Sequence, residues 1–389
     1  MSPRSKKEYL EAIVPRYRKA SAQQKSKILD EFCQTYPCHR KHAIRLLNHY
    51  KRFTKPKRKK RGRPSRYKKF SVLKPLIRIW HAAQRPCSKR LKVILPLWLP
   101  SYAQEFGILA PKVAKALLDI SASTIDRLLK PTRRKYRQYG RSTTRPGTLL
   151  RHQIPIKTNQ WEEFRPGFLE ADTVAHCGSR IEGQYVYTVD FVDIATGWTE
   201  QRAVWGRGET DVLQRIKDVE KSLPFPLRGF DCDNGSEFLN HHLLRHFSDP
   251  QRKIIIQFTR SRAYKKDDNA HIEQKNNTHI RQWLGYGRFD NPLITELLND
   301  LYTSEWRLLQ NFFLPSVKLI DKKRLASKII KKYDSPKTPL QRVLESDDID
   351  ISKQTKTKLT ELFNQLNPFK LRYAIDKKIQ KILQLASPC

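Results

Sequence analysis

The sequence predicts an α/β core, with a mixed five-stranded sheet and flanking helices, between helical regions at both ends. Residues 166–206 hold three runs rich in β-branched and aromatic residues, which short glycine turns separate. Helix-like and strand-like runs then alternate up to residue 284. Three strands followed by such alternation indicate a mixed sheet that is flanked by helices.

The chain has 389 residues and 38% hydrophobic content, which suits two or three domains with buried cores. It contains no run near the roughly 18 consecutive apolar residues of a membrane span. The first 19 residues lack the apolar segment of a secretory signal. We therefore expect a cytoplasmic protein without a membrane partner.

The formal charge of +39 is concentrated in the N-terminal part. Residues 1–150 hold 39 Lys and Arg against 7 Asp and Glu, whereas residues 151–389 hold 38 against 31. Basic side chains that neutralise phosphates release condensed counterions, so a nucleic acid is the expected partner. A solvated surface or an RNA-associated tail is the alternative, and the charge alone does not choose DNA over RNA.

Residues 1–50 predict short helices, the last of them basic over residues 39–50. Its apolar positions face inward, which leaves Arg40, Lys41 and Arg45 on the outside. Two helices, a turn and a basic last helix suit a helix-turn-helix, whose second helix enters the major groove. An ordinary helical bundle is the alternative, but the charge of the last helix favours DNA binding.

Six cysteines are scattered through the chain, which argues against a disulfide framework. Possible zinc ligands near the N-terminus are Cys33, Cys38, His39 and His42. Zinc is conceivable there, but Cys-x2-Cys pairs are the stronger signal, and this stretch is equally typical of a loop that opens a helix. The sequence leaves zinc binding open.

Residues 51–70 predict a polybasic linker, because they hold 12 Lys and Arg and no acid and should stay extended by self-repulsion. Arg61 and Arg63 stand in an Arg-Gly-Arg-Pro sequence that resembles the core of an AT-hook. Such arginines lie in narrow A·T minor grooves, where the potential is most negative. A tether that grips phosphates without groove preference is an equal alternative.

Residues 71–135 predict a second helical DNA-binding unit, followed by a basic linker over residues 136–160. The last helix of this unit begins after an N-cap at Ser121 or Ser123. The residues that it would present to DNA are Ser123, Thr124 and Arg127. A plain core helix is the competing interpretation.

The predicted α/β core covers residues 161–290. Its strand-like runs are residues 167–174, 185–194, 200–206, 227–232 and 253–261. Its helix-like runs are residues 209–223, 236–247 and 269–284. Residues 291–389 are mainly helical, with amphipathic segments at 293–313 and 368–385 and a short hairpin or extended arm within 324–344.

Three carboxylates of the core have contexts that suit one metal site. Asp172 and Asp233 each end an apolar run, and the two strands are expected to be neighbours, so both groups should meet at one edge of the sheet. Asp233 is favoured over Asp231 because Asn-Gly breaks the strand directly after it. Glu273 lies on the following helix and could reach the same edge. Hard divalent cations prefer such carboxylate oxygens.

Other acids of the core compete with these three. Asp190 and Asp193 lie in the second strand and its turn, and Asp193 is expected to cap that turn. Asp267 and Asp268 suit the first turn of a helix, where the dipole favours acids. Three unrelated surface acids are the remaining alternative, since acid triples also occur by chance.

Four segments resemble the catalytic core of insertion-sequence transposases with a retroviral-integrase-type (DDE) domain. They are GFLEADTVAHCG, TVDFVDIATGWTEQRAV, DNGSEF and SRAYKKDDNAHIEQKNN. The resemblance covers residues 160–290 closely and implies an RNase H-like fold. It also implies that Asp172, Asp233 and Glu273 hold two Mg²⁺ (or Mn²⁺) ions. The interval before Glu273 is slightly longer than usual, and the zinc-binding N-terminal module of retroviral integrases is absent.

The resemblance implies a DNA transposase, associated with the nucleoid, that acts on double-stranded DNA and on no small-molecule substrate. It would hydrolyse a phosphodiester at each element end and transfer the 3′-OH into target DNA. A homo-oligomer on DNA is expected if two ends are processed together. Residues expected to contact DNA near Glu273 are Lys265, Lys266, Lys275, Asn277 and Arg281. A DNA-binding regulator and a structure-specific nuclease on the same fold are the alternatives.

Overall fold

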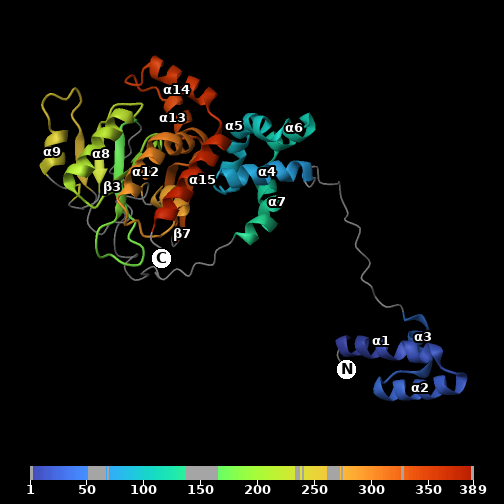
Figure 1. The fold of residues 1–389 in the computed structure, drawn as a ribbon. Coiled ribbons are helices and arrows are strands. Elements are labelled where there is room, and N and C mark those ends of the chain that lie inside the picture. Colours follow the sequence, from blue (N-terminus) through green and yellow to red (C-terminus); the bar gives the residue numbers. More distant parts are fainter. Residues whose placement is uncertain are drawn as a thin grey trace. The chain divides into compact units, whose positions relative to one another are not determined.

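A computed structural model describes residues 3–50, 67, 70–136, 165–232, 237–238, 241–260, 272, 275–325 and 328–386. The chain divides into two units, Met1–Ser65 and Arg66–Cys389 (Figure 1). Each unit has its own hydrophobic core. No helix within the described ranges is long and apolar enough to cross a membrane.

The described part of the first unit is helical. Its helices are α1 (Pro3–Lys19), α2 (Ala22–Thr35) and α3 (Arg40–His49). Ser21 begins α2 with a capping box, in which its side chain and that of Gln24 each accept a hydrogen bond from the other residue's backbone N–H. Phe32 of α2 lies in one buried cluster with Ala43 and Leu47 of α3. The predicted helices are confirmed, and a helix-turn-helix that contacts DNA stays a prediction.

In the sequence of the second unit, two sets of helices precede and follow the strands of the sheet. The first set is α4 (Phe70–Ala82), α5 (Ser88–Phe106), α6 (Pro111–Asp119) and α7 (Ala122–Lys135). The second set is α12 (Leu293–Leu301), α13 (Pro339–Glu345), α14 (Lys353–Gln365) and α15 (Pro368–Leu385). Trp98 of α5 is fully buried, and its ring packs edge-on against Phe313 and Phe369, with centroids 6.4 and 4.9 Å away. The two sets of helices therefore share one core.

Five strands form one mixed sheet in the order β3-β2-β1-β4-β5. They are β1 (Phe168–Ala175), β2 (Val186–Asp193), β3 (Thr199–Trp205), β4 (Gly229–Cys232) and β5 (Gln257–Arg260). The first three strands pair antiparallel, and β4 pairs parallel to both β1 and β5. The prediction of a mixed five-stranded sheet with flanking helices is confirmed.

One face of the sheet is apolar. Alternation along the strands puts Ala171, Val189 and Phe230 on this face, where they join one buried cluster with residues of α8 (Glu209–Ser222) and α9 (His241–Phe247). Figure 1 shows α8 beside the strands. The aromatic and β-branched residues that predicted strands are therefore the residues that hold these two helices to the sheet.

Two predicted elements differ in extent from the observed ones. The strand expected over 253–261 begins at Gln257, because its parallel partner β4 spans only 4 residues. The helix expected over 293–313 is kinked at Ser304, whose φ and ψ are both −107°. The Ser304 hydroxyl donates to the carbonyl of Asp300 one turn earlier, a contact that bends helices.

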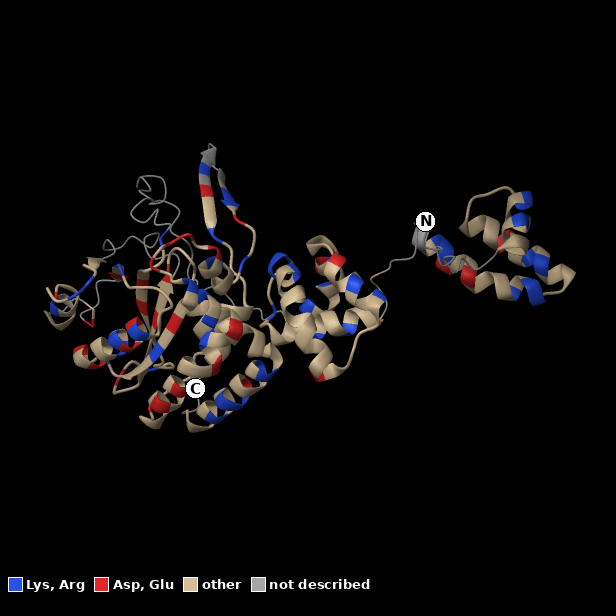
Figure 2. Ribbon diagram, turned by 90° about the horizontal axis from the view of Figure 1, so that it is seen from above, with Lys and Arg blue, Asp and Glu red and all other residues tan. Residues whose placement is uncertain are grey.

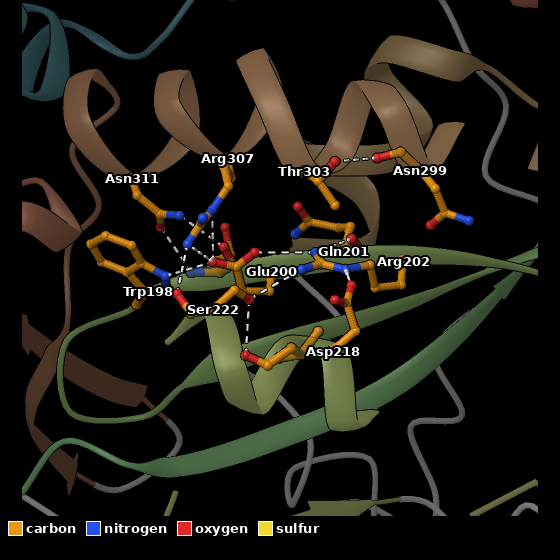
Figure 3. A network of polar contacts seen from close by, with 12 residues as sticks. Trp198, Glu200, Gln201, Arg202, Asp218, Ser222, Asn299, Thr303, Arg307 and Asn311 are labelled. Atoms are coloured by element: carbon orange, nitrogen blue, oxygen red, sulfur yellow. Dashed lines mark hydrogen bonds and ion pairs between the residues drawn. The ribbon is translucent and has the colours of Figure 1, made fainter. Parts of the chain in front are cut away.

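Two asparagines cover the outer edge of β3 (Figure 3). Asn311 Oδ1 accepts from Thr199 N, and Asn311 Nδ2 donates to Thr199 O, both at 2.8 Å. Asn299 makes the same pair of bonds to Ala203 N and O, at 2.8 and 2.9 Å. An uncovered edge strand exposes unpaired N–H and C=O groups that can recruit another strand. The amides satisfy these groups and close this edge.

A buried ionic network next to this edge ties β3 to helices on both sides. Glu200 is 1% exposed and accepts from Arg307 at 2.8 Å, from Trp198 Nε1 at 3.0 Å and from Arg202 at 3.2 Å. Arg202 also donates to Asp218 of α8 at 2.6 Å (Figure 3). Buried charges are tolerated when they are paired and hydrogen-bonded in this way.

We predict that Asn311→Ala lowers the free energy of unfolding by about 2–4 kcal/mol. The change leaves the buried N–H and C=O of Thr199 without partners, and each such group costs about 1–3 kcal/mol. Urea unfolding followed by circular dichroism measures the effect. Asn364→Ala, at an exposed position of α14, is the matched control and should change stability by less than about 0.5 kcal/mol. An equal effect of both variants would contradict the role of Asn311.

Candidate active site

The second face of the sheet carries four carboxylates, which we call the acidic face: Glu170, Asp172, Asp190 and Asp231. Their common side follows from strand alternation and register, since Asp172 pairs with Asp190 and Glu170 pairs with Asp231. Glu170, Asp190 and Asp231 are 2%, 0% and 4% exposed. Buried carboxylates need hydrogen-bond donors or positive charges as partners. The elements that cover this face therefore determine which partners each carboxylate has.

Asp172 lies in the middle of β1, not at its end as the sequence predicted, because β1 continues to Ala175. The described parallel pairing with β4, however, ends at Ala171 and Cys232. Asp172 is thus the first β1 residue beyond that pairing, and it is half-buried. Its Oδ1 accepts from Thr173 N at 2.7 Å, and its Oδ2 accepts from Asn276 Nδ2 at 2.6 Å.

Asp190 of β2 is the direct neighbour of Asp172. Its Oδ1 accepts from Gln201 Nε2 at 2.7 Å, whereas its Oδ2 is buried without a hydrogen-bond partner among the described residues. Burial raises the pKa of Asp190 to about 7, and the negative charge of Asp172 adds to this rise, while Gln201 and Lys275 oppose it. A buried carboxylate oxygen with no partner beside a second carboxylate suits a cation.

Asp193, the other rival in the second strand, has a structural role. Its Oδ2 accepts from the backbone N–H and the hydroxyl of Thr196, at 2.7 and 2.6 Å. Its Oδ1 accepts from Gly167 N at 2.7 Å. The prediction that Asp193 caps the turn is confirmed. These hydrogen bonds engage both carboxylate oxygens of Asp193.

The segment after residue 271 runs along β1. Ile272 N donates to Glu170 Oε2 at 3.2 Å, Asn276 contacts Asp172, and Arg281 donates to the carbonyl of Ala175 at 2.6 Å. Residues Asn276–Arg281 form a wide turn with π-helical hydrogen bonds, and such turns are frequent at functional sites. Three successive contacts therefore hold this segment against the strand that contains Asp172.

Lys275 is influenced by the charges of Asp190, on the acidic face, and of Arg90. Its side chain is half-buried, and burial lowers its pKa to about 7. The charge of Arg90 lowers the pKa further, and the charge of Asp190 opposes the shift. The charges of Lys275 and Asp190 thus each affect the pKa of the other group.

A neutral histidine supports the far end of β1. His176 is fully buried, and its ring stacks on Phe289 with centroids 4.6 Å apart. Its Nε2 is 2.9 Å from Thr188 Oγ1, which in turn is 2.9 Å from the hydroxyl of Tyr302. Burial lowers the pKa of His176 to about 3, and nearby Arg281 lowers it further. His176 therefore stays neutral at every physiological pH.

Several predicted site residues lie outside the described residues. They are Arg61, Arg63, Asp233, Lys265, Lys266 and Glu273. Near the acidic face, Asn277 is exposed, and the half-buried Arg281 guanidinium also lies 5.0 Å from the ring centre of Tyr286. The structure thus describes one member of the predicted carboxylate triad, Asp172.

The predicted DNA contacts of the helical regions are mostly on the surface. Lys41 and Arg45 of α3 are exposed. Arg40 forms an ion pair with Asp30 and donates to Ser26 Oγ at 2.7 Å, so part of its hydrogen-bonding capacity is used within the unit. DNA binding by these three basic residues stays a prediction.

On α7, the N-cap is Ser121, whose side chain accepts from Thr124 N at 3.2 Å. Ser123 and Arg127 are exposed, and Arg127 donates to the half-buried Thr124 hydroxyl at 3.0 Å. Their contact with DNA also stays a prediction.

The residues considered for zinc do not form a metal site. Burial raises the pKa of the Cys38 thiol, and its hydrogen bond with Cys33 raises it further, which keeps the thiol protonated. His39 Nδ1 accepts from Lys41 N at 3.3 Å and caps α3. Among the described residues, no three His, Cys, Asp or Glu side chains come together as metal ligands.

Sequence reasoning missed the partners of Asp172. Glu170 stands two positions before Asp172, and strand alternation alone puts both on one face. Asp190 was considered only as a rival, because its register against β1 is not visible in the sequence. Asn276 was missed because its neighbours Lys275 and Asn277 were expected to contact DNA, and nothing local distinguishes it from them.

The comparisons with known proteins give one close relative. The uncharacterized protein y4rM of Sinorhizobium fredii is 36% identical over 350 residues, which cover 88% of this chain and 96% of y4rM. The catalytic core domain of BIV integrase matches 45% of this chain and 91% of its own, at 14% identity and a TM-score of 0.27. A chain of the simian T-cell lymphotropic virus intasome in complex with PP2A regulatory subunit B56 gamma matches 64% of this chain and 76% of its own, at 12% identity and a TM-score of 0.34. No family model matches the chain.

We predict that His176 makes stability fall as the pH decreases below 6.5. The folded state keeps His176 neutral down to about pH 3, whereas the unfolded state takes up a proton near pH 6.5. The resulting loss is about 1.4 kcal/mol per pH unit between these values. His176→Phe should be less stable than wild type at pH 8, and this difference should shrink by about 2 kcal/mol at pH 5.

Urea unfolding at several pH values tests this prediction. His241→Phe, at an exposed position of α9, is the matched control, and its difference from wild type should not depend on pH in this way. A difference between His176→Phe and wild type that is constant from pH 8 to pH 5 would show that His176 is not held neutral.

Proposed function

We propose a function for this chain, which belongs to the same family as the Sinorhizobium fredii protein y4rM: it is a metal-dependent DNA transposase. It hydrolyses a phosphodiester bond at the ends of a mobile element and transfers the resulting 3′-OH into target DNA. The single observation that supports this most is the convergence of three chain segments on Asp172.

The first two segments are β1 and β4. Cys232 ends β4 opposite Ala171 in the parallel register. Asp233 directly follows Cys232 in the sequence, as Asp172 directly follows Ala171. This correspondence supports Asp233 as a second ligand beside Asp172, since hard divalent cations are held by several carboxylates.

The third segment contains Glu273. Ile272 on one side of it is bonded to Glu170, and Asn276 on the other side is bonded to Asp172. These contacts support Glu273 as the third ligand, because the chain on both sides of it already lies against β1. We propose Asp172, Asp233 and Glu273 as the catalytic and metal-binding residues.

The donor set suits a hard divalent cation. All proposed ligands offer carboxylate oxygens, which Mg²⁺ and Mn²⁺ prefer over thiolates and imidazoles. The buried Asp190 Oδ2 lacks a hydrogen-bond partner among the described residues and lies next to Asp172, and a bound cation would favour the charged form of Asp190. When bound, two such ions would offset the charge of the reacting phosphate and make a water or a 3′-OH a better nucleophile.

The protein's own groups would orient the site and the DNA. The Asn276 amide holds one oxygen of Asp172, which fixes the direction of the carboxylate. Lys265 and Lys266, by their position in the sequence before Glu273, and the exposed Asn277 would contact the DNA backbone. Positioning and charge stabilisation suffice for phosphate chemistry, so no covalent protein–DNA intermediate is needed.

The partner is double-stranded DNA, bound by a homo-oligomer when two element ends are joined to one target. The excess of Lys and Arg in residues 1–150 supports a polyanion. In this proposal Arg40, Lys41, Arg45, Arg61 and Arg63 contribute to DNA binding.

We predict that Glu273→Gln, Asp172→Asn and Asp233→Asn each reduce strand transfer by at least about 10³-fold. Each change removes one charged ligand, and charge stabilisation by the ions is worth several kcal/mol at 1.36 kcal/mol per tenfold. The assay uses purified full-length protein, labelled element-end DNA and Mg²⁺, and it resolves cleaved from joined products. Glu361→Gln, at an exposed position of α14, is the matched control and should join DNA like wild type.

The products distinguish this proposal from its alternatives. Joined DNA from wild type and the control, and none from the three variants, is the expected result. Cleavage without joining would indicate a structure-specific nuclease. Specific binding without any chemistry, by wild type and variants alike, would indicate a DNA-binding regulator.

A further inference from the structure

A two-stranded antiparallel ribbon stands apart from the five-stranded sheet. It consists of β6 (Leu319–Leu325) and β7 (Lys328–Tyr333), which pair only with each other. Figure 2 shows the ribbon projecting beyond the neighbouring helices, with Lys and Arg along both strands. Neither the proposed carboxylate site nor its DNA contacts give this ribbon a role.

The base of the ribbon is fixed to the body of the second unit. Ser316 and Lys337 exchange backbone hydrogen bonds at 2.9 and 3.1 Å. Arg342 of α13 donates to Asp334 at 2.6 Å and to the carbonyl of Ser316 at 3.1 Å. Lys318 donates to the carbonyl of Ala195 at 2.6 Å. These contacts fix the direction in which the ribbon extends from the rest of the second unit.

The strands beyond this base are exposed. Ile320, Ile330 and Tyr333 are 61%, 53% and 50% exposed. A two-stranded hairpin is marginal by itself, and exposed apolar side chains on such an element suit contact with a partner. The ribbon thus has a fixed base and an outer part that suits a partner.

The charge of the ribbon indicates the chemistry of that partner. Residues 318–333 contain seven Lys and Arg and one Asp. The one acid, Asp321, is 3.3 Å from Lys323. Lys331 and Lys332 are exposed, and their backbones pair with Lys322 and Asp321 of β6. A second copy of the same ribbon would bring like charges together, whereas a polyanion would neutralise them.

We propose that the β6–β7 ribbon enters a groove of double-stranded DNA, with Lys331 and Lys332, which lie on opposite faces of β7, on the phosphates of the two groove walls. A major groove admits a two-stranded β-ribbon. This inference rests on the proposed function for the identity of the polyanion. It adds to that function a DNA contact outside the helical regions and the carboxylate site.

The experiment measures how the affinity of the full-length protein for a labelled DNA duplex depends on salt. Lys331→Ala/Lys332→Ala should reduce the slope of log K against log salt by about 2, since each phosphate contact contributes about 0.9. The affinity at 0.1 M salt should fall roughly 10- to 60-fold. Lys353→Ala/Lys358→Ala removes the same charge from exposed positions of α14 and should leave the slope unchanged. Lys331→Arg/Lys332→Arg should bind like wild type.

Each other outcome has a definite meaning. If both alanine variants lose the same slope, or neither loses any, the ribbon makes no special contact and the inference is wrong. If the ribbon variant binds duplex DNA like wild type but changes the molar mass in light scattering, the ribbon joins two copies instead. A wild-type preference for single-stranded RNA over duplex DNA would also overturn it.

The same measurements separate this inference from the proposed chemistry. If the slope depends on Lys331 and Lys332 but no DNA is joined, the ribbon contact stands and the transposase proposal fails. If DNA is joined and the slope is independent of these lysines, the ribbon inference fails alone. If wild type binds no duplex even at low salt, both fail together.

Discussion

One face of the five-stranded sheet is acidic, and the segments of the second unit that cover it supply hydrogen bonds to its buried carboxylates. Burying an unpaired carboxylate is costly, so each one needs a donor, a proton or a cation. Gln201 donates a hydrogen bond to Asp190, and the Thr259 hydroxyl donates one to Asp231 at 2.6 Å. The backbone N–H of Ile272 donates one to Glu170. These needs place the segment after residue 271 against β1, and that placement brings together the elements of the candidate site.

The opposite face requires little beyond apolar packing. There, α8 and α9 bury the alternate side chains of the same strands. The edge at β3 is closed by asparagine amides from the kinked helical segment, and the ionic network around Glu200 holds that segment in position. The apolar face therefore stabilises the fold by packing. The carboxylates of the acidic face depend for their charge state on the groups that bind them.

Much of the second unit could be predicted from local pattern. The runs that became β1, β2, β4, α8 and α15 contain apolar residues in patterns that predict their type, and most of these apolar residues are buried. Asp193 could be assigned to its turn because Asp caps its own backbone over two residues. By contrast, the partnership of Asp190 with Asp172 depends on antiparallel register, which is set by contacts between strands. The kink at Ser304 was not predicted, because a serine within a helix need not bond the carbonyl one turn earlier as Ser304 does.

The wide turn over Asn276–Arg281 has a consequence for how the chain can vary. In an ordinary α-helix, residues five apart are about 140° out of phase around the axis, so Asn276 and Arg281 would not both face one strand. The π-helical hydrogen bond from Gln282 N to Asn277 O adds a residue to the turn and brings both side chains toward β1. A one-residue deletion between them would restore an ordinary α-helix and leave the two residues four apart, so both would still face β1. Relatives of this chain that lack this residue should therefore have a regular α-helix here and keep both contacts.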